Sequence, residues 1–409
     1  IDREVVDNGA APAELARFLT PARRSRIPPP PASPTPPRTP PRAAPHHPRP
    51  PPRDALRPPP RPEGAGPAGR MLTGVVPTEM VGQVSPEDLA GVALGNIYFF
   101  ASCIFGMGLL FSLDPVVSQA MGAGDRDAMA RGVQRGLVMA FGLALLASAL
   151  LTLAGPVLTL LRQPPEVVPL AAGYAWASIA GVLPFYGFLV LRQTLQAQGT
   201  VLAIVVAMAV ANVANVGFNW VLVYGNLGLP ELGAVGTGWA SSLSRTLLAL
   251  GVLFASWPRL HDLLRPLRPE AIRWPPIRRM LGIGAPIGAQ MAMEYGAFGT
   301  AGLAMGLLGT VAVAGHQVAL NLSALTFMVP LGGAQATAVL VGRGVGAEDP
   351  SRARRAAVGG LAVGAGFMVG TMVLFLLLPE ALAGIYSDDA PVVALAASLL
   401  PIAALFQVF

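Results

Sequence analysis

The sequence predicts an all-α polytopic membrane protein, built from two six-helix lobes that are related by a parallel repeat. Three observations predict it: long apolar segments, linkers whose charge alternates in sign, and a first half that recurs about 224 residues later. The 409-residue chain is 53% hydrophobic and 12% charged, with a mean hydropathy of +0.57. Soluble domains carry about 25% charged residues, so this composition is typical of a membrane protein.

Apolar stretches dominate the chain from residue 71 onward. About 20 apolar residues cross a bilayer as a helix, and backbone groups in lipid must form their hydrogen bonds within the segment. Residues 71–84 have the composition expected at the end of one further helix. Complete helices are predicted near residues 89–121, 133–161, 167–191, 201–224, 235–257, 280–307, 311–341, 356–378 and 391–409.

The linkers between these helices alternate in charge. One set is rich in arginine and comprises residues 126–135, 258–279 and 343–355. The other set is acidic and carries Glu87, Asp88, Glu166, Glu231, Glu380, Asp388 and Asp389. The positive-inside rule places the basic set in the cytoplasm. Each basic linker then follows an even-numbered helix, provided that one helix precedes residue 85, and both lobes have the same orientation in the membrane.

Two pairs of segments show the repeat most clearly. The sequence PVVSQAMGAGDRD at 115–127 aligns with TAVLVGRGVGAED at 337–349, and VVPLAA at 167–172 aligns with VVALAA at 392–397. Repeated halves in an apolar chain are typical of secondary transporters, whose substrate site lies between the halves. The repeat therefore predicts transport. It leaves residues 185–257 without a counterpart, so we expect a twelve-helix protein that is truncated at both ends here, with about 9–10 helices.

These features divide the chain into four regions. They are a disordered Pro/Arg-rich tail at 1–70, an N-terminal transmembrane lobe at 71–257 with an incomplete first helix, a basic cytoplasmic linker at 258–279, and a C-terminal transmembrane lobe at 280–409 that lacks its last two helices. The tail holds 21 of the 41 prolines, and such runs are extended and solvated. It is either a proline-rich ligand for a partner or a disordered tail without a binding role, such as translation in a wrong frame would produce.

The charge of the chain belongs to this tail. The formal net charge is +6, but residues 71–409 hold 16 arginines and 16 acids, so their own sum is zero. A basic face that would indicate nucleic-acid binding is therefore not predicted. The single cysteine, Cys103, excludes a disulfide within the chain and a cysteine-based metal site.

Four stretches of the chain carry a family pattern. They are LDPVVSQAMGAG at 113–124, NVGFNWVLVYG at 215–225 with the PELG and GTG motifs that follow it, GAP at 284–286 with Glu294 farther along the same helix, and VAGHQVALN at 313–321. Together they resemble the multidrug and toxic compound extrusion (MATE) family, its NorM-like branch most closely, over residues 71–409.

The resemblance implies two lobes around a central cavity that rock between inward-open and outward-open states. It implies a secondary active antiporter that exports organic cations and other drugs in exchange for Na⁺ or H⁺. We expect a monomer that crosses the inner membrane several times. It should need no cofactor other than the coupling ion, and its partners should be small organic cations and the lipid bilayer.

Glu294 is the candidate coupling residue. It is the only acid between Glu270 and Glu348, and it falls in the middle of a predicted helix. A lone carboxylate at this depth is unfavourable unless it is protonated, paired or bound to a cation. The matching Glu of the family belongs to the cation-coupling site, so the resemblance implies that Glu294 binds the proton or, in a sodium-coupled protein, the Na⁺. The alternative is a structural Glu that is hydrogen-bonded to a neighbouring helix.

Three amides form a second candidate group. Asn212, Asn215 and Asn219 are spaced by three and four residues, so one helix face carries all three. The resemblance places Asn215 and Asn219 in a polar pocket of the N-terminal lobe. The alternative is that these amides hold helices together through hydrogen bonds.

Further candidates lie in the C-terminal lobe. Gln290 is four residues before Glu294 and shares its helix face, whereas Tyr295 is adjacent and points elsewhere. Either residue is equally well explained by packing. His316, near the start of a helix, is a candidate for titration with external pH, although a His that orders the helix junction is the commoner case.

Glycine pairs precede two of the basic linkers. Gly122 and Gly124 lie before the first, and Gly344 and Gly346 lie in the matching segment of the second half. Because glycine favours the conformations that end helices, we predict that these residues mark the helix ends before the linkers and form turns.

The sequence departs from the family at two expected acids. Pro77 stands where the family carries an Asp in the first helix, and Glu79, two residues on, would face another side. A second family acid lies just beyond a Gln that corresponds to Gln407, and the sequence given ends at Phe409. Two of the three intramembrane carboxylates implied by the resemblance are thus missing from this sequence.

The sequence bears on three alternative functions. An enzyme is not predicted, because the chain lacks the HExxH, GxSxG and P-loop motifs. A related lipid or glycolipid flippase would line its cavity with several arginines, whereas Arg192 and Arg245 stand almost alone outside the linkers. That distribution favours cationic or neutral substrates. A truncated remnant without transport activity is the third alternative.

Overall fold

The computed structural model describes residues 85–228, 230–387 and 389–407, without the side chains of residues 303 and 306. Contacts divide the chain into two units, Ile1–Arg57 and Pro58–Phe409, and every helix described below belongs to the second. All regular elements among the described residues are helical. The predicted tail at 1–70 and the predicted helix end at 71–84 lie outside the described residues.

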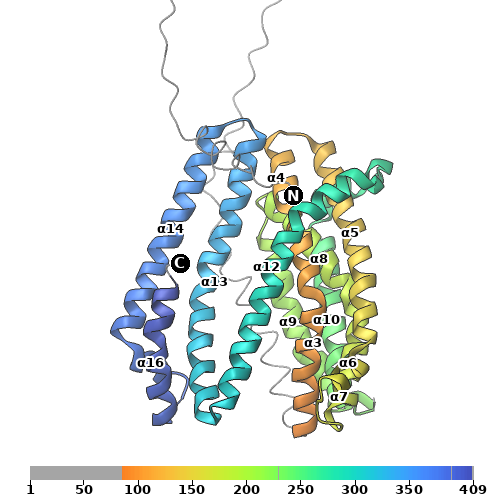
Figure 1. The fold of residues 1–409 in the computed structure, drawn as a ribbon. Helices are drawn as coiled ribbons and strands as arrows, with labels where there is room; N and C mark the ends of the chain where they lie inside the picture. The colour runs from red at the N-terminus through yellow and green to blue at the C-terminus, as the bar shows by residue number, and fades with distance from the viewer. Residues whose placement is uncertain (1–84, 229, 388, 408–409) are drawn as a thin grey trace, which may run out of the picture. The chain divides into compact units, whose positions relative to one another are not determined.

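The N-terminal lobe consists of helices α3 to α10 (Figure 1). They are α3 (Pro86–Leu110), α4 (Leu113–Gly122), α5 (Arg126–Thr152), α6 (Ala154–Leu160), α7 (Val167–Ser178), α8 (Val182–Ala197), α9 (Leu202–Leu222) and α10 (Gly233–Ala255). The short segments η2 (Ile179–Gly181) and η3 (Asn226–Gly228) complete the lobe. Helices α3 and α4 form one apolar span of 37 residues, and α7 and α8 form another of 31.

The C-terminal lobe follows a linker that contains α11 (Trp257–Leu264) and η4 (Pro269–Ile272). Its helices are α12 (Trp274–Leu307), α13 (Thr310–Gly346), α14 (Pro350–Leu377), α15 (Pro379–Gly384) and α16 (Ala390–Phe406). Helix α12 contacts both α3 and α13, and Figure 1 shows it crossing obliquely from the N-terminal lobe to the lower end of α13. It is therefore shared between the lobes.

Several helices begin earlier than predicted, inside the basic linkers. Helix α5 starts at Arg126 rather than near 133, because the Asp125 carboxylate accepts a hydrogen bond from the Ala128 amide at 2.8 Å and caps the helix. Helix α14 starts at Pro350 rather than near 356, because Asp349 caps it through the Arg352 amide at 2.9 Å. The predicted starts were wrong because apolar character reports the membrane depth of a residue, whereas capping decides where helical backbone begins.

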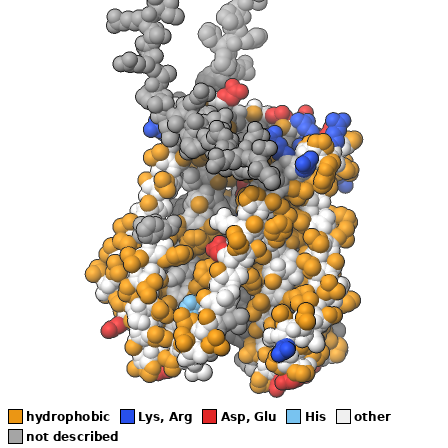
Figure 2. Space-filling model, viewed as in Figure 1, with side chains coloured by type: hydrophobic (Ala, Val, Ile, Leu, Met, Phe, Trp, Pro, Cys, Tyr) orange, Lys and Arg blue, Asp and Glu red, His pale blue; other side chains and the backbone are white. Residues whose placement is uncertain are grey.

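The outer surface of the bundle suits lipid. In the described part of the chain, seven helical segments are long and apolar enough to cross a membrane. Helix α14 exposes large apolar side chains, including Leu361 at 75% and Val363 at 74%. Figure 2 shows hydrophobic side chains along the flanks and arginines gathered at one end. We call this end the basic end; it carries the arginine-rich segments 126–135 and 258–279, and the positive-inside rule predicts that it faces the cytoplasm.

Helices of the N-terminal lobe approach one another closely at glycines. A Cβ atom added to Gly238 of α10 would lie 2.7 Å from the Tyr174 carbonyl oxygen of α7 and 2.8 Å from the Ala177 Cβ. In lipid, helices associate through van der Waals contacts and hydrogen bonds rather than by excluding water, so small residues at such crossings determine how well helices pack. The α7–α10 crossing thus requires glycine at position 238.

We predict that Gly238→Ala destabilises the protein, although alanine stabilises a helix by about 1 kcal/mol relative to glycine. Overpacking against a backbone atom costs about 1–3 kcal/mol, so the net effect should lower the thermal midpoint by a few degrees. The matched control is Gly217→Ala on α9, where an added Cβ meets nothing within 4 Å, and this change should leave the midpoint unchanged or raise it. Thermal unfolding of both purified variants in detergent tests this, and equal midpoints would contradict it.

Candidate functional site

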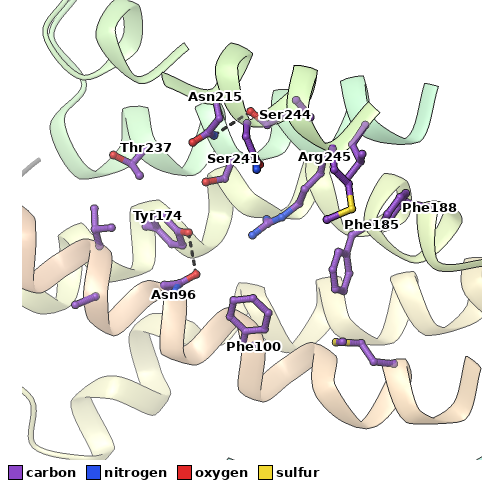
Figure 3. A pocket seen from close by; sticks show the side chains of 17 residues that line it. Asn96, Phe100, Tyr174, Phe185, Phe188, Asn215, Thr237, Ser241, Ser244 and Arg245 are labelled. Atoms are coloured by element: carbon purple, nitrogen blue, oxygen red, sulfur yellow. Dashed lines mark hydrogen bonds between the residues drawn. The ribbon is translucent and has the colours of Figure 1, made fainter. Parts of the chain in front are cut away.

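The N-terminal lobe contains a cavity of about 360 Å³ that is bordered by α3, α7, α8, α9 and α10 (Figure 3). Its polar wall consists of Asn96, Asn212, Asn215, Thr237, Ser241 and Ser244. Its aromatic wall consists of Phe100, Tyr174, Phe185 and Phe188. Arg245 contributes the only charge among the described lining residues. The cavity is thus large enough for a small organic molecule and combines aromatic surface with hydrogen-bonding groups.

The predicted amides of α9 occupy different places. Asn212 and Asn215 line the cavity, whereas Asn219 is fully buried next to Asn215. The Asn215 side-chain nitrogen donates to the Ser244 hydroxyl of α10 at 2.9 Å, and the Asn219 nitrogen donates to the Asn215 carbonyl at 2.8 Å. Asn215 therefore faces the cavity and also joins α9 to α10 through a hydrogen bond. The two alternatives given for this residue, a place in a pocket and a contact between helices, do not exclude each other.

Arg245 projects from α10 into the same cavity. Its guanidinium carbon lies 3.8 Å from the centroid of the Phe99 ring, a cation–π contact. Figure 3 shows the guanidinium pointing toward Tyr174 and Asn96, which are joined by a hydrogen bond of 3.3 Å from the Tyr174 hydroxyl. The Nη1 atom of Arg245 is buried and has no hydrogen-bond partner among the described residues.

The sequence had indicated this arginine without assigning it a role. Arg245 is one of two arginines outside the linkers, and on the sequence alone their scarcity favours cationic or neutral substrates. The signal that was available is its position, since an ionisable residue within an apolar span is functional by default. What the sequence did not show is that its guanidinium reaches a cavity.

Glu294 lies in α12 and is exposed, as is Gln290 one turn before it. The face of α12 that packs on α3 includes Gly288 and Tyr295; the Tyr295 hydroxyl donates to the Ile97 carbonyl at 3.4 Å. With 3.6 residues per turn, Glu294 lies about a third of a turn from this face. Its carboxylate is therefore beside the contact between the lobes and outside the closely packed part of that contact.

His316 lies in the second turn of α13 and is partly buried. Its Nε2 atom is buried without a hydrogen-bond partner in the described part of the chain. Neither His316 nor Glu294 lines the cavity of the N-terminal lobe. The cavity thus brings together Asn212 and Asn215 of the predicted site residues, and not Gln290, Glu294, Tyr295 or His316.

The lobes meet at the basic end through the two copies of the repeat. An added Cβ on Gly122 of α4 would collide with the Arg343 carbonyl oxygen of α13, and one on Gly346 would collide with the Gln119 carbonyl oxygen. The Arg343 guanidinium also donates to the Ala197 carbonyl at the end of α8, through Nε at 2.8 Å. The repeated segments thus pack against each other and close the basic end.

This contact corrects the prediction that the repeat glycines form turns. Gly124 has a positive φ of 69° and does form a turn. Gly122 and Gly346 are instead the last residues of α4 and α13, and Gly344 lies in the last turn of α13. These three glycines mark helix ends as predicted, but an added Cβ at each would collide with the backbone of a neighbouring helix. Three of the four glycines are therefore explained by close packing, which a single sequence does not distinguish from a turn.

A second polar contact joins the lobes within the membrane-spanning helices. Arg192 of α8 donates a hydrogen bond to the Gln335 side chain of α13. This is the other arginine that the sequence placed outside the linkers, and it is buried. It therefore belongs to the contact between the lobes and does not line the cavity described above.

Comparison with known proteins identifies relatives of this chain. The family model described as MatE matches residues 71–221 and 286–409. The multidrug resistance protein MdtK of Edwardsiella ictaluri is 34% identical over 338 residues, which cover 82% of this chain and 74% of MdtK. The probable multidrug resistance protein NorM of Bradyrhizobium diazoefficiens is 38% identical over 282 residues, which cover 68% of this chain and 60% of NorM.

Solved structures share the fold. The eukaryotic MATE transporter AtDTX14 superposes with a TM-score of 0.74 at 19% identity, over 84% of this chain and 77% of that protein. A MATE structure in the bent conformation also gives 0.74, at 20% identity, over 84% and 76%. From the family match, these relatives and the predominantly apolar helices, we conclude that the chain belongs to the MATE family of multidrug efflux transporters, which are multi-pass proteins of the inner membrane.

Proposed function

We propose that this protein is a secondary antiporter that exports organic cations and other drugs in exchange for Na⁺ or H⁺, acting as a monomer. Glu294 would be the coupling carboxylate. The observation that carries the proposal is the position of Glu294, an exposed acid far from either end of α12 that has no ion pair within the described residues. The multidrug resistance names of the relatives support the substrate class.

The physical argument starts from the cost of charge in a membrane. A carboxylate that lacks a partner in the bilayer is stabilised by taking up a proton or a cation. Na⁺ and H⁺ both meet that need, so either ion would bind where Glu294 is accessible. A ligand shifts a conformational equilibrium only through its different affinity for the two states. Glu294 lies on α12, which contacts both lobes, so its occupation would bias their relative position.

The contact at the basic end supports alternating access. The glycine contacts between α4 and α13 and the hydrogen bond from Arg343 to Ala197 hold the lobes together there. An inward-open state would require these contacts to part. Few polar interactions would be broken, because most of the contact is van der Waals packing at small residues. The facing surfaces of α4 and α13 would pack together again in the outward-open state.

We predict that Glu294→Gln abolishes gradient-driven drug efflux, with a loss of at least about tenfold, because an amide does not carry the charge to which the coupling ion binds. Efflux of a fluorescent organic cation from proteoliposomes should be measured under a Na⁺ gradient and, separately, under a pH gradient. The gradient that drives efflux in the unmodified protein identifies the coupling ion.

The matched control for this experiment is Glu380→Gln, which changes an acid in the first turn of α15, outside the predicted coupling site. This variant should transport as the unmodified protein does, and both variants should insert into the membrane equally. Unchanged efflux by a well-inserted Glu294→Gln protein would reject the coupling role.

We predict that Gly346→Leu blocks the transport cycle, since its side chain would prevent α13 from closing on Gln119 of α4. Efflux should fall by at least about tenfold, as expected when a bulky residue is forced into a backbone contact. The open state can be detected with Ser118→Cys, which replaces a buried residue of α4, in a Cys103→Ala background. A maleimide applied from the cytoplasmic side should label this cysteine faster when Gly346→Leu is also present than when Gly346 is unchanged.

The control for the steric effect is Gly359→Leu on α14, where an added Cβ has no neighbour within 4 Å. It should leave both efflux and the reactivity of the cysteine at position 118 unchanged. If Gly346→Leu behaves like Gly359→Leu, the contact at the basic end is not part of the cycle.

A further inference from the structure

We propose that the cavity of the N-terminal lobe binds the carboxylate of an aromatic organic anion or zwitterion, with Arg245 as its counter-ion. The inference deepens the proposed export function, on which it rests for the statement that the ligand is a substrate. It changes the expected substrate class, because the sequence alone favoured cationic or neutral molecules. The proposed coupling residue Glu294 lies on α12, outside this cavity, and takes no part in the binding.

The first argument is the charge of the cavity. Arg245 is the only charged side chain among the described residues that line it, and it forms no ion pair with any described acid. Its Nη1 atom is buried without an acceptor. A buried charge is expensive unless it is paired and hydrogen-bonded. The cavity is therefore lined by a guanidinium whose charge has no counter-ion among the described residues, and the carboxylate of a ligand would supply one.

The second argument is the orientation of the guanidinium. Phe99 lies against it, with 3.8 Å between the guanidinium carbon and the ring centroid, and the Phe185 ring is 6.0 Å away. These contacts hold the side chain in place, while Figure 3 shows its nitrogens directed toward Asn96 and Tyr174 across the cavity. A positioned guanidinium is suited to bidentate hydrogen bonding with a planar carboxylate.

The third argument concerns the remainder of the ligand. The wall around Arg245 carries the rings of Phe100, Phe185 and Phe188, and Met208 adds a flexible apolar side chain. Aromatic rings pack well on such surfaces, and methionine adapts to ligands of different shape. The Asn96 and Ser241 side chains offer further hydrogen-bonding groups. A carboxylate attached to one or two fused rings matches this arrangement and fits a volume of about 360 Å³.

The experiment measures binding without an ion gradient, so its outcome is independent of the efflux tests above. Purified whole protein is immobilised on scintillant beads, and tritiated 2-naphthoate is the probe. Unlabelled 2-naphthoate, the neutral 2-naphthamide and the cationic 2-naphthylmethylammonium compete with it. These three compounds share the ring system and differ in charge. We expect 2-naphthoate to compete at least about tenfold better than either of the others, as for a hydrogen bond to a charged group.

Variants then locate the site. Arg245→Gln should weaken 2-naphthoate binding by at least about tenfold, and Arg245→Lys should retain part of it because the charge remains but the planar guanidinium is lost. The matched control is Arg354→Gln, an exposed arginine of α14, which should bind as the unmodified protein does. If Arg245→Gln does not fold, the competition experiment on the unmodified protein still decides the outcome.

Two outcomes would overturn the proposal. One is equal competition by the three naphthyl compounds, or preference for the cation. The other concerns Glu79, an acid outside the described residues. Binding of 2-naphthoate that appears only after Glu79→Gln would mean that this glutamate, rather than a substrate, neutralises Arg245.

Discussion

Close contact between helices at glycine is the constraint on which this structure depends. In lipid, an apolar side chain gains little free energy by moving from the lipid to a contact between helices. Helix association therefore relies on van der Waals packing and hydrogen bonds. Gly284 and Gly288 let α12 lie against α3, and Gly122 and Gly346 let α4 lie against α13. The lobes are thus joined mainly by surfaces with small side chains. Such surfaces fit closely when together and break few strong interactions when they separate, which suits a transporter that alternates between two states.

The polar groups inside the membrane divide between the lobes. Arg245 lies beside a cavity in the N-terminal lobe, whereas Glu294 is exposed on α12, beside the contact between the lobes. These two charges have opposite sign and do not form an ion pair with each other. Because each is costly in lipid without a partner, each is available to a ligand of the opposite charge. The proposed coupling ion and the proposed carboxylate would then occupy different sites on one molecule.

Particular residues show why sequence and structure agreed for the helices but not for the glycines. A helix that crosses a bilayer must satisfy its own backbone hydrogen bonds, so its apolar length appears directly in the sequence. Capping by Asp125 and Asp349 then moved two helix starts into the basic linkers. Gly122 and Gly346 looked like turn residues because glycine serves turns and close contacts equally well. Only the position of the partner helix distinguishes these roles.

The sequence by itself determined the fold class, the repeat, the orientation suggested by the basic linkers and the family, because all four depend on composition, periodicity and motifs along the chain. The tertiary structure decided which polar residues meet. It placed Asn215 at both a cavity wall and a helix contact, separated the N-terminal amides from Glu294, and directed Arg245 into an aromatic cavity. These relations depend on the rotation and packing of whole helices, and spacing within one helix does not encode which neighbour its face will meet.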